Sequence, residues 1–323
     1  MRGRRRPVQR GVTLAVAAVV ALSLSVSAGA SRPRATPPAP GTAAQIAALV
    51  HAAPTIAKLP AAGYPTLTAE GIDSASRAFP VTSHGCLTIS ECVFGDLSAT
   101  RTIVLFGDSH AQMWLSAVVP DAVALRYRVV LLFLGGCPDA TLTVWNAAPL
   151  GPYPTGWYRG CDAFRSRAIR AIVHLQPALV LMSNRTSMVM SGSSSYFTNA
   201  QWEAGLRTTI VALKRPATKV AVIGDLDYFS QQMPECLAAY PSSVQKCASP
   251  NPDRSSHGHE SAESVEAGKL GVAFIDVLPW MCSTTCSPVI GNFLPYLNST
   301  HLDATYVTFL SKVMQTALGK VLG

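Results

Sequence analysis

The chain has 323 residues, of which 49% are hydrophobic and 14% are charged, so it can bury a substantial core and is not a disordered chain. Its formal net charge of +8 includes five arginines within the first thirty residues, which contain no acidic residue, and the rest of the chain carries only +3. A charge this small and scattered, without interleaved aromatic and basic residues, excludes nucleic acid as a predicted partner.

The first thirty residues have the pattern of an export signal. The arginines precede an apolar run from Gly11 to about Ala28, and Ala28-Gly29-Ala30 is a small-x-small cleavage pattern. The apolar run is short for a membrane span, although an uncleaved anchor is an open alternative. We therefore predict an exported protein, secreted or associated with the cell envelope, whose residues 1–30 are a signal peptide or an N-terminal anchor.

A segment rich in proline and alanine follows this signal. Residues 31–41 are proline-rich and typical of an extended linker, whereas residues 42–58 are alanine-rich and have helical character until Pro60. The predicted linker spans residues 31–54, and the predicted globular domain spans residues 55–323.

Eight cysteines fall into four pairs that are close in sequence: Cys86 with Cys92, Cys137 with Cys161, Cys236 with Cys247, and Cys282 with Cys286. An even number in an exported chain favours disulfides, and we expect pairing between nearest neighbours, although the sequence alone does not fix the connectivity. A metal site that includes Cys282 and Cys286 is the alternative. It lacks a second closely spaced Cys/His pair, so no metal is predicted.

Apolar runs and helical segments alternate along the predicted domain. Five runs are expected to be strands: 101–106, 128–134, 178–183, 219–224 and 272–277. The segments with helical spacing are 110–127, with a break expected at Pro120, 162–174, 199–214, 258–269, and about 300 or 303 to the end. Residues 76–100, 225–255 and 278–298 are expected to be irregular. This alternation predicts a parallel sheet covered by helices on both faces.

The first of these strands leads directly into Gly107-Asp108-Ser109-His110. Open α/β sheets bind their ligands at the carboxyl edge, and a serine at a helix N-terminus has backbone N–H groups nearby that can stabilise an oxyanion. Ser109 is therefore the candidate nucleophile; the alternative is a serine that only caps the helix. Asp108 is expected to anchor the turn. His110 is expected to line the pocket or to be a polar residue of the first helical turn.

His301 is the candidate general base. A serine hydroxyl is a poor nucleophile until a neighbouring base takes its proton, and imidazole suits that task at neutral pH. The alternative is a solvent-facing histidine before the last helix, because the chain has seven histidines. His257-Gly258-His259 lies in a polar loop and is a weak candidate for metal binding.

The segments Phe106-Gly107-Asp108-Ser109-His110 and Tyr296-Leu297-Asn298-Ser299-Thr300-His301-Leu302 together resemble the SGNH hydrolase superfamily. Within it, the chain resembles the SGNH domain that is fused to, or partnered with, membrane acyltransferase-3 proteins that O-acetylate cell-envelope polysaccharides. The resemblance spans roughly residues 55–320. Further shared features are Leu59-Pro60, the Cys86/Cys92 pair, Gly136-Cys137-Pro138 and Met281-Cys282 with Cys286.

This resemblance implies a three-layer α/β/α sandwich with a parallel, flavodoxin-like five-stranded sheet. It implies an esterase or O-acyltransferase that forms an acyl-Ser109 intermediate with His301 as the base, and no cofactor. The oxyanion would be held by the backbone N–H of Ser109, by Gly136 (or Gly135), and by Asn184, which is otherwise a turn residue. The implied partners are cell-envelope carbohydrate with acyl esters, acetyl foremost, and a membrane acyltransferase-3 protein.

One position departs from the family pattern. The family has an aspartate three residues before the histidine, where this chain has Asn298. In a serine protease the corresponding Asp→Asn change lowers kcat about 10⁴-fold, because the imidazole takes the wrong tautomer. The outcomes are a slow enzyme, a site rescued by another carboxylate such as Asp303 or Asp276, or a degenerate domain that binds saccharide as an accessory module. We favour an active or weakly active enzyme.

Overall fold

The computed structural model describes residues 38–67, 79–81, 85–146, 149, 152–190, 195–226, 229–249 and 258–323. The predicted export signal, residues 31–37 of the predicted linker, and His257 lie outside these residues. Within the described part of the chain, no helix is both long and apolar enough to span a membrane.

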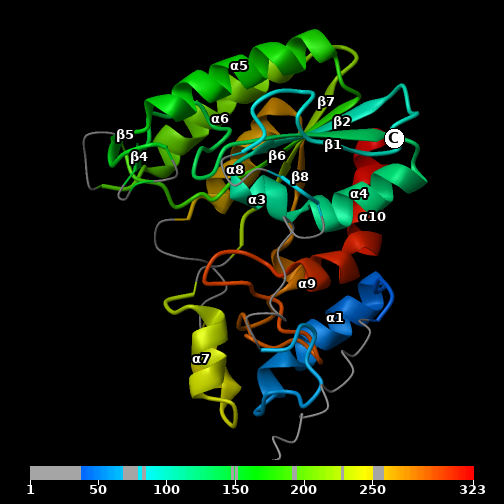
Figure 1. Cartoon of the computed structure of the whole chain (residues 1–323), viewed down its shortest axis with the longest axis vertical. Coiled ribbons are helices and arrows are strands. Elements are labelled where there is room, and N and C mark those ends of the chain that lie inside the picture. Colours follow the sequence, from blue (N-terminus) through cyan, green and yellow to red (C-terminus); the bar gives the residue numbers. More distant parts are fainter. Residues whose placement is uncertain are drawn as a thin grey trace, which may run out of the picture. The chain divides into compact units, whose positions relative to one another are not determined.

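A mostly parallel sheet forms the centre of the fold (Figure 1). Its strands, in spatial order, are β1 (Val93–Gly95), β3 (Arg128–Phe133), β2 (Thr102–Gly107), β6 (Leu179–Ser183), β7 (Lys219–Ile223) and β8 (Ala273–Ile275). The five predicted strands are confirmed and run parallel to their neighbours. The sixth, β1, pairs antiparallel with β3 at the edge, in a segment that we expected to be irregular.

Helices cover both faces of the sheet (Figure 1). Because side chains alternate along a strand, Ile103 and Leu105 of β2 point into one core and Val104 and Phe106 into the other. The first core is closed by α4 (Leu115–Ala124), α9 (Ala304–Phe309) and α10 (Ser311–Leu322), and the second by α5 (Arg159–Leu175), α6 (Asn199–Leu213) and α8 (Glu260–Leu270). The predicted three-layer α/β/α arrangement is confirmed.

Two helical boundaries differ from expectation. Pro120 lies inside α4, and the break falls earlier, at Trp114, between α3 (Ser109–Met113) and α4. Near the N-terminus, α1 (Ala43–Ala52) begins with a capping box at Thr42 and buries Ile46 and Val50 in the core. Helix α1 therefore packs with the domain, whose start we expected at residue 55.

The connections carry short elements and the cysteines. The loop after β3 contains a two-stranded hairpin of β4 (Trp145–Asn146) and β5 (Gly156–Trp157), and the loop after β7 contains α7 (Met233–Ala239), which we expected to be irregular. Three 3₁₀ turns complete the described elements: η1 (Ala53–Thr55), η2 (Val244–Cys247) and η3 (Leu278–Trp280). All four predicted disulfides are present with nearest-neighbour connectivity, which is typical of an exported domain.

Candidate active site

The turn after β2 places Ser109 at the carboxyl edge of the sheet. Asp108 precedes helix α3 and accepts a hydrogen bond from the backbone N–H of His110 at 2.8 Å. The same carboxylate accepts the backbone N–H of Arg185, which follows β6, at 3.1 and 3.2 Å. Asp108 thus ties the turn after β2 to the turn after the neighbouring strand β6, and this connection fixes the position of Ser109.

Ser109 and His301 meet although 192 positions separate them in the sequence. The Oγ atom of Ser109 lies 2.8 Å from Nε2 of His301. This is hydrogen-bond distance and is the contact that a serine nucleophile and its general base require. His301 reaches the site from the loop that precedes α9, and its side chain is half-buried.

Asn298 holds the other side of the His301 ring. Its Oδ1 accepts the backbone N–H groups of Thr300 and His301 at 2.8 and 2.9 Å, so this atom is the amide oxygen and not the nitrogen. The same oxygen lies 3.1 Å from Nδ1 of His301. Because Oδ1 only accepts, this contact favours the tautomer with the hydrogen on Nδ1, in which Nε2 faces Ser109 with its lone pair. Asn298 therefore supports the tautomer that can take a proton, but it brings no negative charge.

Burial keeps His301 neutral. Burial, together with the neighbouring His110 and the Arg185 charge, lowers the pKa of His301 to about 3. A neutral imidazole can accept the proton of Ser109. The imidazolium that forms, however, has a neutral amide at Asn298 where the family has a carboxylate.

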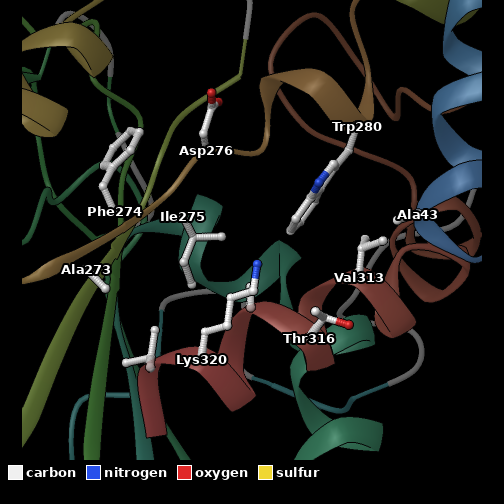
Figure 2. A pocket seen from close by; sticks show the side chains of 11 residues that line it. Ala43, Ala273, Phe274, Ile275, Asp276, Trp280, Val313, Thr316 and Lys320 are labelled. Atoms are coloured by element: carbon white, nitrogen blue, oxygen red, sulfur yellow. The ribbon is translucent and has the colours of Figure 1, made fainter. Parts of the chain in front are cut away.

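Neither alternative carboxylate takes over that position in the observed contacts. Asp303 caps α9, where its Oδ1 accepts the backbone N–H of Thr305 at 2.8 Å. Asp276 is exposed and lines a separate pocket of about 390 Å³. Figure 2 shows it there together with Trp280 and Lys320. The lining of that pocket includes neither Ser109 nor His301. The Nδ1 atom of His301 is held instead by Asn298 and, at 3.0 Å, by the hydroxyl of Thr300.

Behind Ser109 and His301 lies a second histidine–carboxylate pair. His110 is fully buried, and its ring packs edge-on against His301, with 4.7 Å between ring centroids and 69° between planes. Its Nδ1 lies 2.6 Å from Oδ1 of Asp225, which follows β7. Sequence reasoning missed Asp225. The available signal was an acid just after a buried strand, since carboxyl ends of parallel strands share one edge.

Gly136 lies in the turn after β3, at the same edge of the sheet, with a φ of +64°. The Cys137–Cys161 disulfide ties this turn to α5, and the Tyr158 hydroxyl donates to the carbonyl oxygen of Gly135 at 3.1 Å. The turn is therefore held in place. That Gly136 or Gly135 and the backbone N–H of Ser109 bind an oxyanion stays a prediction.

Asn184 does not have the geometry expected of an oxyanion donor. It is fully buried, and its Nδ2 donates to Oδ1 of Asp139 at 2.9 Å and to Oε1 of Glu263 at 3.5 Å. Its Oδ1 accepts the backbone N–H of Asp139. Because both amide hydrogens are directed to carboxyl groups, the structure gives no support to the role expected for Asn184. It belongs instead to a buried polar cluster with Asp139 and Glu263.

This cluster predicts that the protein is more stable at acidic pH. Burial raises the pKa of Asp139 to about 8 and that of Glu263 well above its usual range. These groups in the folded chain therefore hold protons that the unfolded chain releases above about pH 4, so their contribution to the free energy of unfolding falls as pH rises from 4 to 8. Urea unfolding at pH 5 and pH 8 measures this slope.

Asp139→Asn should reduce that slope and stabilise the protein at pH 8 by about 1–2 kcal/mol relative to the wild type. The exposed Asp276→Asn is the matched control. An unchanged slope in Asp139→Asn would show that Asp139 is not the group that binds the extra proton.

No group of metal-binding side chains is found among the residues that the structure describes. His259 packs on the ring of Trp202, with centroids 5.0 Å apart, and its Nδ1 lies 2.7 Å from Oδ1 of Asn199. With His257 outside the described residues, the structure does not test a metal site in that loop.

The geometry defines a class: an α/β/α domain with a serine and a histidine in contact at the carboxyl edge of its sheet. The family model of the SGNH domain (fused to AT3 domains) matches residues 78–316. The chain belongs to this family. No curated protein sequence matches it.

The solved structures that are similar to this chain are distant in sequence. The chain is similar to the periplasmic domain of a lipopolysaccharide acetyltransferase from Salmonella ser. Paratyphi A (17% identity, TM-score 0.54), with 69% of this chain and 85% of that one covered. It is also similar to a GDSL-like lipase from Bacteroides thetaiotaomicron (12% identity, TM-score 0.39), with 68% of this chain and 88% of that one covered. A third similar structure is a carbohydrate esterase family 2 enzyme from Corynascus thermopiles (13% identity, TM-score 0.43), with 72% of this chain and 70% of that one covered. At 17% identity, the likeness to the acetyltransferase domain concerns the fold alone.

Proposed function

We propose that this protein is an exported serine esterase or O-acyltransferase that acts on acyl esters, acetyl foremost, of cell-envelope carbohydrate. The observation that carries the proposal is the 2.8 Å contact between Oγ of Ser109 and Nε2 of His301. Family membership and the acetyltransferase domain of similar fold support the substrate class. The Arg-rich, apolar start of the chain and the four disulfides support export.

The reaction runs in two halves. In the first, Oγ of Ser109 attacks the ester carbonyl carbon while its proton passes to Nε2 of His301. The resulting oxyanion is held by backbone N–H groups of Ser109 and of Gly136 or Gly135. The carbon–oxygen bond to the leaving alcohol then breaks, His301 returns the proton to that alcohol, and the acyl group stays on Ser109.

In the second half, His301 takes a proton from water or from a sugar hydroxyl, which attacks the carbonyl carbon of the acyl-Ser109 ester. The bond between that carbon and Oγ of Ser109 then breaks, and His301 returns the proton to Oγ. Water gives hydrolysis, and a sugar hydroxyl gives acyl transfer. The family's fusion to AT3 domains supports a membrane acyltransferase-3 protein as the source of the acyl group. Acetate release from acetylated envelope glycan, with and without added acceptor sugar, separates the two outcomes.

A serine-directed fluorophosphonate probe tests the nucleophile. The wild-type protein should be labelled, and Ser109→Ala should lose the label completely because the probe needs the activated hydroxyl. The exposed Ser98→Ala is the matched control and should label like the wild type. Labelling that persists in Ser109→Ala would place the nucleophile elsewhere.

Asn298 favours a second candidate, a degenerate domain that binds saccharide as an accessory module. This candidate predicts no labelling of the wild-type protein at any pH, together with retained binding of envelope glycan. The two proposals therefore differ in the first experiment.

Asn298→Asp should raise kcat for ester hydrolysis about tenfold, the equivalent of one pKa unit of added stabilisation of the His301 imidazolium. The gain is far below the 10⁴-fold loss known from a protease, because Asn298 already supports the correct tautomer. Steady-state hydrolysis of an activated acetate ester measures it. An unchanged kcat would show that the carboxylate at this position adds nothing.

A further inference from the structure

Acylation places a positive charge on His301 in a half-buried position. The ring takes the proton of Ser109, and its hydrogen-bond partner on the other side, Oδ1 of Asn298, is neutral. An imidazolium in such a place is stabilised by a negative charge nearby. A negative charge from a residue other than Asn298 would therefore raise the activity of this site.

The residue that packs on His301 is His110, which immediately follows the nucleophile. Its ring is fully buried and contacts the His301 ring edge-on, with 4.7 Å between centroids. On its other side it reaches the Asp225 carboxylate through Nδ1, at 2.6 Å. A carboxylate that is hydrogen-bonded to an imidazole fixes the orientation of the ring and makes it more electron-rich. The His110 ring thus lies between the His301 ring and the Asp225 carboxylate, and in a buried site a negative charge acts on a nearby cation with less screening than in water.

Asp225 is held by fixed donors that favour its charged form. Its Oδ2 accepts the backbone N–H and the hydroxyl of Thr186 at 2.7 and 3.2 Å, and its Oδ1 also accepts the backbone N–H of Leu226 at 2.8 Å. Burial raises the pKa of Asp225 to about 7, against the effect of these bonds and of the Arg185 charge. The ionised fraction of this carboxylate therefore increases with pH through the neutral range.

Other ionisable groups surround the pair. Asp108, at the end of β2, lies close enough to interact with both His110 and Asp225, and Glu263 of α8 interacts with Asp225. Arg185, after β6, is the positive charge on this side, and it interacts with His110, His301 and Asp225. Burial raises the pKa of Asp108 and of Glu263, which favours their neutral forms. Asp225 is thus the carboxylate that is linked to His301 by direct contacts, because it contacts His110 and His110 contacts His301.

We infer that His110 and Asp225 are positioning residues that take the place of the missing aspartate, because the Asp225 charge, relayed by the His110 ring, stabilises the imidazolium formed on His301. The inference rests on the proposed function. The proton moves only between Ser109 and His301, and Asp225 stays a carboxylate throughout. A purely structural role for the pair would not depend on which residue occupies position 298.

A double-mutant cycle tests this dependence. Asp225→Asn should lower kcat for ester hydrolysis about tenfold in the wild-type background. In the Asn298→Asp background, where a carboxylate contacts His301 directly, the same change should lower kcat less than about threefold. Equal loss in both backgrounds would overturn the inference while the proposed function stands. Absence of any Ser109-dependent hydrolysis would overturn both.

The pH profile gives an independent readout. In the wild type, kcat should rise about tenfold through pH 7 to a higher plateau, and Asp225→Asn should keep the lower plateau throughout. Thr186→Val keeps the side-chain shape and removes one hydrogen bond to Asp225, so it should move this step to higher pH. This variant provides the test if Asp225→Asn does not fold. A step that persists in Asp225→Asn, or that stays in place in Thr186→Val, would overturn the inference.

Discussion

His301→Gln is expected to lower Ser109-dependent ester hydrolysis by at least about 10³-fold. Glutamine keeps a polar side chain of similar reach but has no nitrogen that can take the serine proton, so the Oγ of Ser109 stays a weak nucleophile. Both kcat/KM for an activated acetate ester and the rate of fluorophosphonate labelling should fall together, because both depend on the same proton transfer.

The matched control is His174→Gln. His174 is exposed in the last turn of α5, and the same substitution there should leave both rates unchanged. If His301→Gln kept most of its activity, the 2.8 Å contact with Ser109 would be a structural hydrogen bond and the proposed mechanism would fail.

The sequence predicts the central fold well because local signals agree with the tertiary structure. The five parallel strands are continuous apolar runs, which is the sequence pattern typical of strands that are buried on both faces. The edge strand β1 was missed because its three residues are only half-buried and are too few to show an alternation of apolar and polar residues. They become a strand through the pairing of Val93 with Val130, a contact between distant segments that no local pattern reveals.

The same contrast holds at the candidate site. Ser109 and His301 lie in short motifs whose residue types indicate their chemistry, and the structure brings the two side chains together. Asp225 has no motif, and only the sheet topology shows that the ends of β2 and β7 converge on one place. The expectation for Asn184 came from its place after a strand, whereas its hydrogen bonds are decided by Asp139 and Glu263, which come from other segments.

The neutral side chain of Asn298 illustrates why a sequence motif alone does not determine whether the site is active. From the sequence, an amide at this position predicts the wrong imidazole tautomer, by analogy with a protease. In the structure, the backbone N–H groups of Thr300 and His301 fix the amide oxygen toward the ring. The amide therefore favours the tautomer that can take the serine proton, and what the substitution removes is the charge. These two effects differ by orders of magnitude in rate, and only the local hydrogen bonds distinguish them.

Gly107→Ala is expected to lower the free energy of unfolding by about 3 kcal/mol or more. Gly107 has a φ of +154° at the end of β2, and a Cβ there would overlap the carbonyl oxygen of Ser183 on the paired strand β6. It would also lie 3.0 Å from the Ser183 carbonyl carbon and 3.3 Å from Cβ of Ala111. Because backbone atoms cannot give way as a flexible side chain does, the two strands would have to separate. Urea unfolding and the thermal midpoint measure the loss.

Gly268→Ala is the matched control for this substitution. Gly268 lies within α8, and a Cβ there meets no heavy atom within 4 Å. The same added methyl group should stabilise the protein by about 0.5–1 kcal/mol, since alanine loses less conformational entropy in a helix than glycine does. Gly107→Ala protein that still folds should also be labelled more slowly at Ser109, because a separation of β2 from β6 moves the turn that Asp108 ties to Arg185. Suppose instead that Gly107→Ala lowers the free energy of unfolding by less than about 1 kcal/mol and that labelling of Ser109 is normal. The strands would then separate without moving Ser109, and their close approach would not be what positions the nucleophile.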